Sequence, residues 1–403
     1  MTEGRYQFGR WYPFTSAVPM VVSPPSRIVR IDGYEVSCPL PERIGNSRGF
    51  FDSRSALLVA LTTAEGVTGW GETWALPGAA AAIIRQDLGP RLLGQDGAAP
   101  RRLHDRMMQQ FPDRHGVPLM AISALDIAAW DVAARTAGLP LHAALGGAVR
   151  DRVFAYVSGP FLKPGADPYK DYLADLEGYL KAGFRAIKLR LGTTPARDGA
   201  MARQVRERIG PEIPLMVDLN QGFSFGLAAD LARRLVECNV RWLEEPMPHE
   251  DLAGYRRLAE QVPIALAGGE SLFGLGAFRE VIGGNLLQFV QPDLALCGGI
   301  TEGLKIAAFA EAFGIPLVPH VWGTAINFNA SLHFTSVLPE KPGQGMPCPL
   351  FEYDYSYNPL RTLCGEAGVD HAGTLAVPDA PGLGLDLTPD RFKSLIVNQW
   401  TVH

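Results

Sequence analysis

From residue 153 onward, short apolar runs alternate along the chain with longer amphipathic stretches. The short runs have the length of β-strands and the longer ones that of helices, so the pattern predicts consecutive strand–helix units. Eight short runs are present, which is the number of strands that closes a (β/α)-barrel. The predicted barrel strands are 153–158, 185–190, 214–218, 240–244, 264–269, 287–291, 315–319 and 349–353. We therefore expect an α/β fold with a TIM-like (β/α)-barrel over residues 151–363.

The segment before the predicted barrel has a different pattern. Residues 27–32 alternate between apolar and polar positions, and 55–63 and 67–73 are further runs of strand type. Together they predict a small antiparallel sheet. From residue 78 to 135 the pattern becomes helical, with many small residues that allow close helix packing. We expect residues 27–150 to form a separate α+β domain.

A long connection, residues 41–54, separates the first two predicted strands and is rich in Gly, Arg and Phe. It is too long for a tight hairpin turn. Long loops in compact domains often act as lids over ligands. We therefore expect a lid loop in which Arg48, Phe50 and Phe51 close over a ligand, with a plain surface excursion as the alternative.

The two ends of the chain carry no sustained apolar periodicity. Residues 1–26 are polar and rich in proline, and residues 364–403 are rich in glycine and proline. We expect an N-terminal extension and an extended C-terminal arm over the surface. The first residues contain no apolar run of signal-peptide type, and nowhere do about 18 consecutive apolar residues occur. A cytoplasmic protein that neither enters nor binds a membrane is expected.

Composition narrows the class of protein further. The 403 residues are 47% hydrophobic and 20% charged, with a net charge of −5, as in soluble globular proteins with a sizeable core. The slightly acidic balance argues against nucleic acid as a partner. The five cysteines are odd in number and widely scattered, so they form neither a disulfide framework nor a zinc motif. A small molecule is the expected partner.

Three carboxylates stand at the ends of three successive predicted barrel strands. Asp218, Glu244 and Glu270 are each 26 residues from the next, so they repeat with the strand–helix unit. Barrel enzymes collect their chemistry at the carboxyl ends of the strands. Three converging carboxylates in an apolar setting require a cation, and all-oxygen ligation favours Mg²⁺, or Mn²⁺, over zinc. The alternative is that each acid caps the helix that follows it.

Two basic residues end the second predicted barrel strand. Strand alternation places Lys188 and Arg190 on the same side as the carboxylates. Lys188 is expected to act as an electrostatic clamp on a bound anion, or as a base if its pKa is lowered. Arg190 keeps its proton and suits a bidentate contact with a substrate carboxylate. The alternative is an ion-pair lattice inside the barrel mouth.

The next two strand ends carry an acid and a histidine. Asp293 closes the sixth predicted strand and His320 closes the seventh. Because the tips of neighbouring strands lie close together, Asp293 can accept a hydrogen bond from one imidazole nitrogen and leave the other free as a base. We expect His320 and Asp293 to form the general base of an active site.

Four further polar residues occupy the same end of the predicted barrel. Glu352 ends the last strand beside Ser158 of the first strand, where it can hydrogen-bond to a developing enolate oxygen or tie down the lid. Asn220 and Gln221 lie two and three residues after Asp218 and are candidates for substrate hydroxyls. Helix capping is the alternative explanation for Asn220.

Taken together, these residues resemble the enolase superfamily, and within it the mandelate racemase and muconate lactonizing enzyme branch. The resemblance covers nearly the whole chain. The matching motifs are Ala124-Leu-Asp-Ile-Ala-Ala-Trp-Asp, Gly138-Leu-Pro, Leu145-Gly-Gly, Lys188-Leu-Arg, Asp218-Leu-Asn, Glu244-Glu-Pro, Gly269-Glu, Asp293 and His320.

The resemblance implies that the α+β domain caps the barrel and that the C-terminal arm packs back on this capping domain. It also implies that Asp218, Glu244 and Glu270 hold one Mg²⁺, and that a proton alpha to a carboxylate is removed to give an enediolate stabilised by cationic groups. A homo-oligomer is expected, although no apolar stripe marks an interface.

One departure from the family pattern decides between reactions. Family members that remove a proton from either face commonly have a lysine where this chain has Arg190, which leaves His320 as the better base. A one-base reaction is then natural: dehydration of an acid sugar by a hydro-lyase. The alternatives are an epimerase with Lys188 as second base, a sugar-lactone cycloisomerase, and, remotely, a non-catalytic binding protein.

Overall fold

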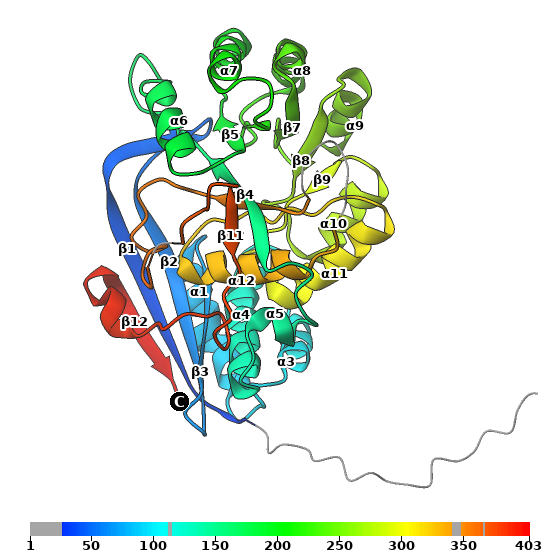
Figure 1. Ribbon diagram of the computed structural model, residues 1–403. Helices are drawn as coiled ribbons and strands as arrows, with labels where there is room; N and C mark the ends of the chain where they lie inside the picture. Colours follow the sequence, from blue (N-terminus) through cyan, green and yellow to red (C-terminus); the bar gives the residue numbers. More distant parts are fainter. Residues whose placement is uncertain (1–25, 112–114, 341–347, 366) are drawn as a thin grey trace, which may run out of the picture.

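The computed structural model describes residues 26–111, 115–340, 348–365 and 367–403. It contains a barrel ringed by helices and a smaller α+β part packed against it (Figure 1). Most of the predicted N-terminal extension, residues 1–25, lies outside the described residues. The two parts share one continuous apolar core that runs from the smaller sheet into the barrel helices, so the boundary between them is a packed interface.

The capping domain is built on a four-stranded antiparallel sheet in the order β12-β1-β2-β3. Its strands are β1 (Ile28–Asn46), β2 (Gly49–Thr63), β3 (Thr68–Thr73) and β12 (Ile396–Val402). The sequence pattern predicted only the first three strands. The C-terminal segment, expected as an extended arm that packs back on the capping domain, ends in β12, which pairs with β1, so the two ends of the described chain lie in the same sheet.

Helices cover the capping sheet on one side. They are α1 (Pro77–Ile83), the π-turn η1 (Ile84–Leu88), α2 (Gly89–Leu92), α3 (Pro100–Met108), α4 (Val117–Thr136) and α5 (Leu141–Ala144). Helix α4 is mostly apolar and buried on nearly all sides, because it packs between the sheet and the barrel. It is also the one helix of the described part that is long and apolar enough to cross a membrane, but 83% of its apolar window is buried inside the protein.

The prediction that residues 41–54 form a loop is wrong. Strands β1 and β2 continue as a two-stranded ribbon up to the pair Asn46 and Gly49, joined by a two-residue turn. The register shifts between Pro39 and Ile44, where proline interrupts the ladder. Figure 1 shows the ribbon, in blue, reaching along the barrel towards α6. At its tip the Ser47 hydroxyl donates to the Leu219 carbonyl at 2.6 Å.

The barrel strands run parallel in the order β10-β4-β5-β6-β7-β8-β9. They are β4 (Arg152–Ser158), β5 (Ile187–Arg190), β6 (Leu215–Asp218), β7 (Val240–Glu244), β8 (Ala265–Gly268), β9 (Phe289–Val290) and β10 (Leu350–Tyr353). The helices between and after them are α6 (Tyr172–Lys181), α7 (Pro195–Ile209), α8 (Phe225–Leu235), the short η2 (Val236–Cys238), α9 (Leu252–Gln261), α10 (Gly274–Gly283), α11 (Gly299–Ala312) and α12 (Ala325–Val337). The tail adds β11 (Thr374–Ala376), antiparallel to β4, and η3 (Pro389–Leu395).

The predicted strand at 315–319 is not a regular strand. The segment runs beside β9, with the Val318 amide donating to the Val290 carbonyl at 3.0 Å. Pro316 and Pro319 have no amide hydrogen, so the ladder cannot continue. Val318 nevertheless packs in the barrel interior with residues of the other strands, including Tyr156. The segment therefore fills the eighth position of the barrel without forming a ladder.

Candidate active site

The three carboxylates meet at the carboxyl end of the barrel. Asp218 and Glu244 end β6 and β7 and are cross-strand partners, and Glu270 follows β8. One oxygen of each lies within 4.8 Å of the others. Asp218 and Glu244 are fully buried, and burial raises the pKa of both carboxyls even though Lys188 lowers it. Three converging carboxylate oxygens with so little water fit a divalent cation with oxygen ligands.

Lys188 lies beneath these carboxylates with no exposed surface. Its Nζ is 2.5 Å from Glu244 Oε1 and 2.7 Å from Glu352 Oε1. Burial on its own would lower the pKa of Lys188, but the Glu244 and Glu352 carboxylates outweigh this effect and hold it well above its ordinary value. In this geometry the Lys188 side chain is a positive charge held between two carboxylates.

Arg190 is held by protein groups on two sides. Its Nη1 donates to Asp218 Oδ2 at 2.7 Å and to Asn220 Oδ1 at 3.1 Å, and its Nη2 donates to Ser158 Oγ at 3.0 Å. The guanidinium lies over the Phe161 ring at 4.7 Å. Ser158 is 1% exposed and points at Arg190, so it orients that side chain and does not line the cavity in which a substrate would bind.

His320 and Asp293 form the expected hydrogen bond. His320 Nδ1 is 2.7 Å from Asp293 Oδ2, and His320 Nε2 is 3.3 Å from Glu270 Oε2. Burial lowers the pKa of His320, but the Glu270, Glu352 and Asp293 carboxylates together raise it to about 10. With Nδ1 committed to Asp293, Nε2 is the nitrogen directed at the three carboxylates and available to exchange a proton.

Glu352, at the end of β10, joins the lysine to the loop that carries the histidine. Its Oε2 accepts a hydrogen bond from the Val321 amide at 3.1 Å, while its Oε1 pairs with Lys188. Burial raises the pKa of Glu352, but Lys188, His320 and Arg190 outweigh this and lower it to about 2. Glu352 is therefore an anion that holds Lys188 and the Val321 amide in place. This agrees better with a structural link between them than with a proton donor.

Asn220 and Gln221, in the loop that follows β6, turn in different directions. Asn220 lines the cavity, whereas Gln221 Nε2 donates to Glu245 Oε2 at 2.8 Å and to Ser271 Oγ at 2.7 Å. Both have positive φ angles, of 40° and 64°, so the chain reverses here and sends the second side chain away from the cavity. The expectation that Gln221 contacts substrate hydroxyls is not met by this geometry.

One cavity of about 280 Å³ joins these groups to the capping domain, at the small end of the volumes that bind small molecules. The barrel contributes Phe161, Arg190, Asn220, Glu270, His320 and Trp322, and the capping domain contributes Asn46, Phe51, Ser53, Arg54, Ser55 and Trp74. Phe51, expected at a lid, does line it, while Arg48 and Phe50 are exposed and do not. Arg54, Trp74 and Phe161 were not predicted, because no local motif marks them.

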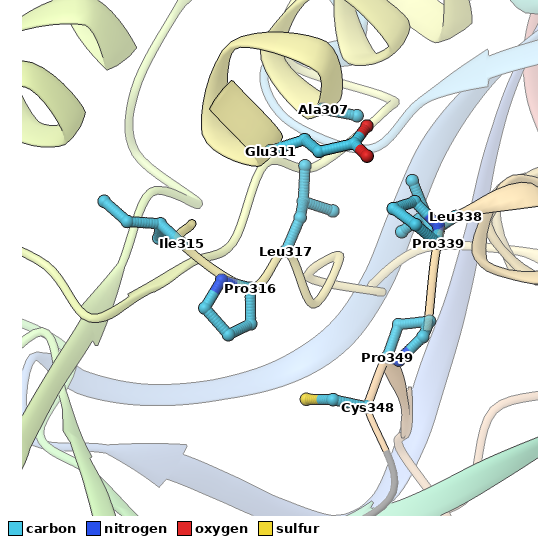
Figure 2. Close-up of a pocket in the computed structure, with 9 residues that line it drawn as sticks. All are labelled: Ala307, Glu311, Ile315, Pro316, Leu317, Leu338, Pro339, Cys348 and Pro349. Carbon is cyan, nitrogen blue, oxygen red and sulfur yellow. The ribbon is translucent and has the colours of Figure 1, made fainter. Parts of the chain in front are cut away.

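A second hollow lies at the opposite, amino-terminal end of the barrel strands. Ile315, Pro316, Cys348 and Pro349 line it beside α11 (Figure 2). Its volume is about 20 Å³, enough for about one water molecule. An acid-sugar-sized ligand does not fit there. The cavity at the carboxyl end is the candidate active site because Arg190, Glu270 and His320 line it.

The capping domain also contacts the catalytic pair directly. Trp74, just after β3, donates its indole N–H to Asp293 Oδ2 at 2.9 Å, and its ring centre is 6.1 Å from that of His320. Its neighbour Glu72 is fully buried and accepts hydrogen bonds from the Thr324 and Asn327 amides at the start of α12. Asn327 in turn donates to Asp293 Oδ1 at 3.0 Å. The capping domain thus supplies one hydrogen-bond donor to Asp293, from Trp74, and helps to position another, Asn327.

Replacing Trp74 with Phe is expected to lower kcat about tenfold, the usual cost of losing an outer hydrogen bond that orients a site residue, with little change in KM. Trp130→Phe is the matched control, because Trp130 makes the same kind of bond, 2.9 Å to Thr301 Oγ1, across the same domain interface. Steady-state kinetics of both variants test this. Equal loss of kcat in the two would show that only interface stability is involved.

Fold and site together define a capped (β/α)-barrel with an acidic cation site and a histidine–aspartate pair at its mouth. Residues 171–391 match the model of the enolase C-terminal domain-like family, and residues 35–146 match that of the mandelate racemase / muconate lactonizing enzyme N-terminal domain. The chain belongs to this family, the mandelate racemase and muconate lactonizing enzyme branch of the enolase superfamily.

Similar proteins include two curated enzymes and a solved structure. The chain is 33% identical to D-galactarolactone cycloisomerase of Agrobacterium fabrum, over 84% of this chain and 91% of that one. It is 31% identical to arabinonate dehydratase of Saccharolobus solfataricus, over 83% and 88%. The structure of L-talarate dehydratase from a Polaromonas species, complexed with Mg and L-glucarate, has a TM-score of 0.80 and 29% identity, over 93% and 99%.

Proposed function

We propose that this protein removes the proton alpha to the carboxylate of an acid sugar and expels the beta hydroxyl as water, which makes it a magnesium-dependent hydro-lyase. The observation that carries the proposal is that His320 and Glu270 line one cavity, with His320 Nε2 3.3 Å from Glu270, which belongs to the cluster of three carboxylates. A base facing an acidic cation site is the arrangement needed to acidify and then remove a proton next to a carboxylate.

Asp218, Glu244 and Glu270 would hold the cation, because their oxygens converge and the burial of two of them disfavours their charged forms without a partner. When bound, Mg²⁺ supplies positive charge that stabilises an enediolate. Lys188 and Arg190 add fixed positive charge beside the same carboxylates. A cation at Glu270 also offsets the largest of the carboxylate charges that raise the pKa of His320, which favours the neutral, basic imidazole.

In the proposed reaction His320 Nε2 accepts the alpha proton, and the C–H electron pair enters the enediolate. Asp293 holds Nδ1–H and stabilises the imidazolium that forms. The imidazolium then returns the proton to the beta hydroxyl as the C–O bond breaks, so that water leaves. The resulting enol becomes a 2-keto-3-deoxy acid by taking up a proton from solvent. His320 therefore takes part in both proton transfers within the site, and no second base is needed.

A second base is the feature that an epimerase would need. Arg190 keeps its proton at any ordinary pH, and the Lys188 ammonium is held by short contacts to Glu244 and Glu352. Both observations support the one-base dehydration over epimerisation. Dehydratases among the relatives, such as the arabinonate dehydratase, also support it.

A sugar-lactone cycloisomerase is the second candidate, because the chain is 33% identical to a D-galactarolactone cycloisomerase. The same base and cation site would serve that reaction, with a ring oxygen leaving in place of hydroxide. The difference between the two lies in the leaving group and not in the base.

The test is a screen of mono- and diacid sugars and their lactones with the Mg²⁺-loaded protein, with semicarbazide to detect 2-keto acids. We expect a signal with one or more open-chain acids. A signal with lactones alone would favour the cycloisomerase. No keto acid, together with deuterium exchange at the alpha carbon in deuterated water, would point to an epimerase and contradict the proposal.

A further inference from the structure

Arg54 is a buried cation that the capping domain extends into the candidate active site. It lies on β2, in the ribbon that reaches over the barrel, and lines the cavity. Only 5% of it is exposed. The other cavity-lining residues of the capping domain within the described chain, Asn46, Phe51, Ser53, Ser55 and Trp74, carry no charge.

The barrel holds the Arg54 side chain in one position. Its Nη2 is 2.8 Å from Asp354 Oδ2 and 2.5 Å from Ser356 Oγ, and its Nε donates to the Tyr357 carbonyl at 3.1 Å. The guanidinium carbon lies 4.2 Å from the centre of the Trp322 ring, another wall of the cavity. A guanidinium fixed by this many contacts is already oriented for a further partner.

One donor of this guanidinium has no partner. Arg54 Nη1 is buried and makes no hydrogen bond to any described residue. Leaving a buried charged donor unpaired is unfavourable, so a site that keeps one is suited to a ligand that brings the acceptor. The neighbouring Arg190 also keeps one unpartnered buried donor, its Nε. Its two terminal nitrogens are already bound to Asp218, Asn220 and Ser158, so Arg190 is less suited to a bidentate contact with a second carboxylate.

We propose that Arg54 determines substrate specificity by binding an oxygen acceptor at the end of the acid sugar remote from the reacting carbon. The inference rests on the proposed function, which puts one carboxylate of the substrate at the acidic cation site. The remote end then extends towards the capping-domain side of the cavity, where Arg54 is the charged group. The chemistry it fits is a second carboxylate, as in a sugar diacid, or the carbonyl of the corresponding lactone.

The experiment compares substrates that differ only at that end, such as galactarate, its lactone and galactonate. Because Arg54→Met alone would leave Asp354 buried and unpaired, the variant is the double substitution Arg54→Met with Asp354→Asn. Asp354→Asn alone is the matched control, since it keeps the guanidinium. Binding is measured by calorimetry with Mg²⁺-loaded protein in a His320→Asn background, and kcat/KM is measured with His320 intact.

We expect the double variant to bind the diacid or the lactone about thirtyfold more weakly, with the same loss in kcat/KM, and the monoacid less than about threefold more weakly. The Asp354→Asn control should keep the wild-type preference for the diacid or lactone over the monoacid. The affinity of Arg54→Lys should lie between those of the wild type and the double variant, because an ammonium lacks the planar fork of a guanidinium. A larger loss for the diacid than for the lactone identifies a carboxylate as the partner, and the reverse identifies a carbonyl.

Equal weakening of all three ligands would overturn the role of Arg54 while leaving the proposed function intact, since a general defect of the capping domain does not discriminate between remote groups. Failure of every acid sugar to bind or react, even with wild-type protein, would overturn both proposals.

Discussion

Replacing His320 with Asn is expected to lower kcat by about a thousandfold, within the range of about 10² to 10⁴ that a positioned general base contributes. The amide can keep a hydrogen bond to Asp293 but cannot accept the alpha proton. Substrate binding and Mg²⁺ binding should persist, because the substitution leaves the three carboxylates in place. Steady-state kinetics on the acid sugar identified in the screen measure the effect.

His333→Asn is the control for this substitution. His333 is another fully buried histidine, stacked on His142 at 5.3 Å and remote from the residues that line the cavity. We expect it to change stability but to leave kcat within about twofold, as for sites that share no partners with the reacting groups. A His320→Asn enzyme that kept a tenth or more of its activity would show that another group is the base.

Asp218→Asn is expected to abolish activity and the stabilisation of the protein by Mg²⁺. Asp218 supplies one of the three converging oxygens and also pairs with Arg190 at 2.7 Å. A ligand that binds only the folded state raises the melting temperature, so the wild-type Tm should rise with Mg²⁺ and that of the variant should not. Thermal melts with and without Mg²⁺ provide the measurement.

Asp198→Asn is the control for the metal site. Asp198 is fully buried too, but it accepts hydrogen bonds from the Gly192 and Thr193 amides and takes no part in the acidic cluster. Its substitution should lower the Tm and leave the Mg²⁺-dependent rise unchanged. The same rise in Asp218→Asn would mean that the cation binds elsewhere.

The parts of the site that the sequence could predict are those set by the strand–helix repeat. Asp218, Glu244 and Glu270 follow a constant spacing, and His320 and Asp293 end neighbouring barrel segments. In a barrel, position at a strand end is enough to bring side chains together. His320 lies beside Asp293 as predicted, although no regular strand forms at 315–319, because that segment still runs beside β9.

The capping-domain half of the site could not be predicted in the same way. Arg54 and Trp74 reach the cavity only because the capping sheet docks on the barrel, and docking depends on tertiary packing that leaves no short-range pattern. Residues 41–54 were misjudged because the segment is rich in Gly, Arg and Phe and too long for a tight hairpin turn, whereas pairing across the ribbon and contacts such as Ser47 with Leu219 hold it as strands. Gln221 was misplaced because a left-handed turn reverses its direction.

The fate of the alpha proton tests the central claim most directly. With substrate deuterated at the alpha carbon, proton NMR should show that turnover releases this deuterium to solvent. In deuterated water, the 2-keto-3-deoxy acid formed from unlabelled substrate should carry one new deuterium at the carbon that lost its hydroxyl. Product that carries the alpha deuterium of the labelled substrate at the carbon that lost its hydroxyl would show a direct transfer within the substrate and would contradict the role assigned to His320.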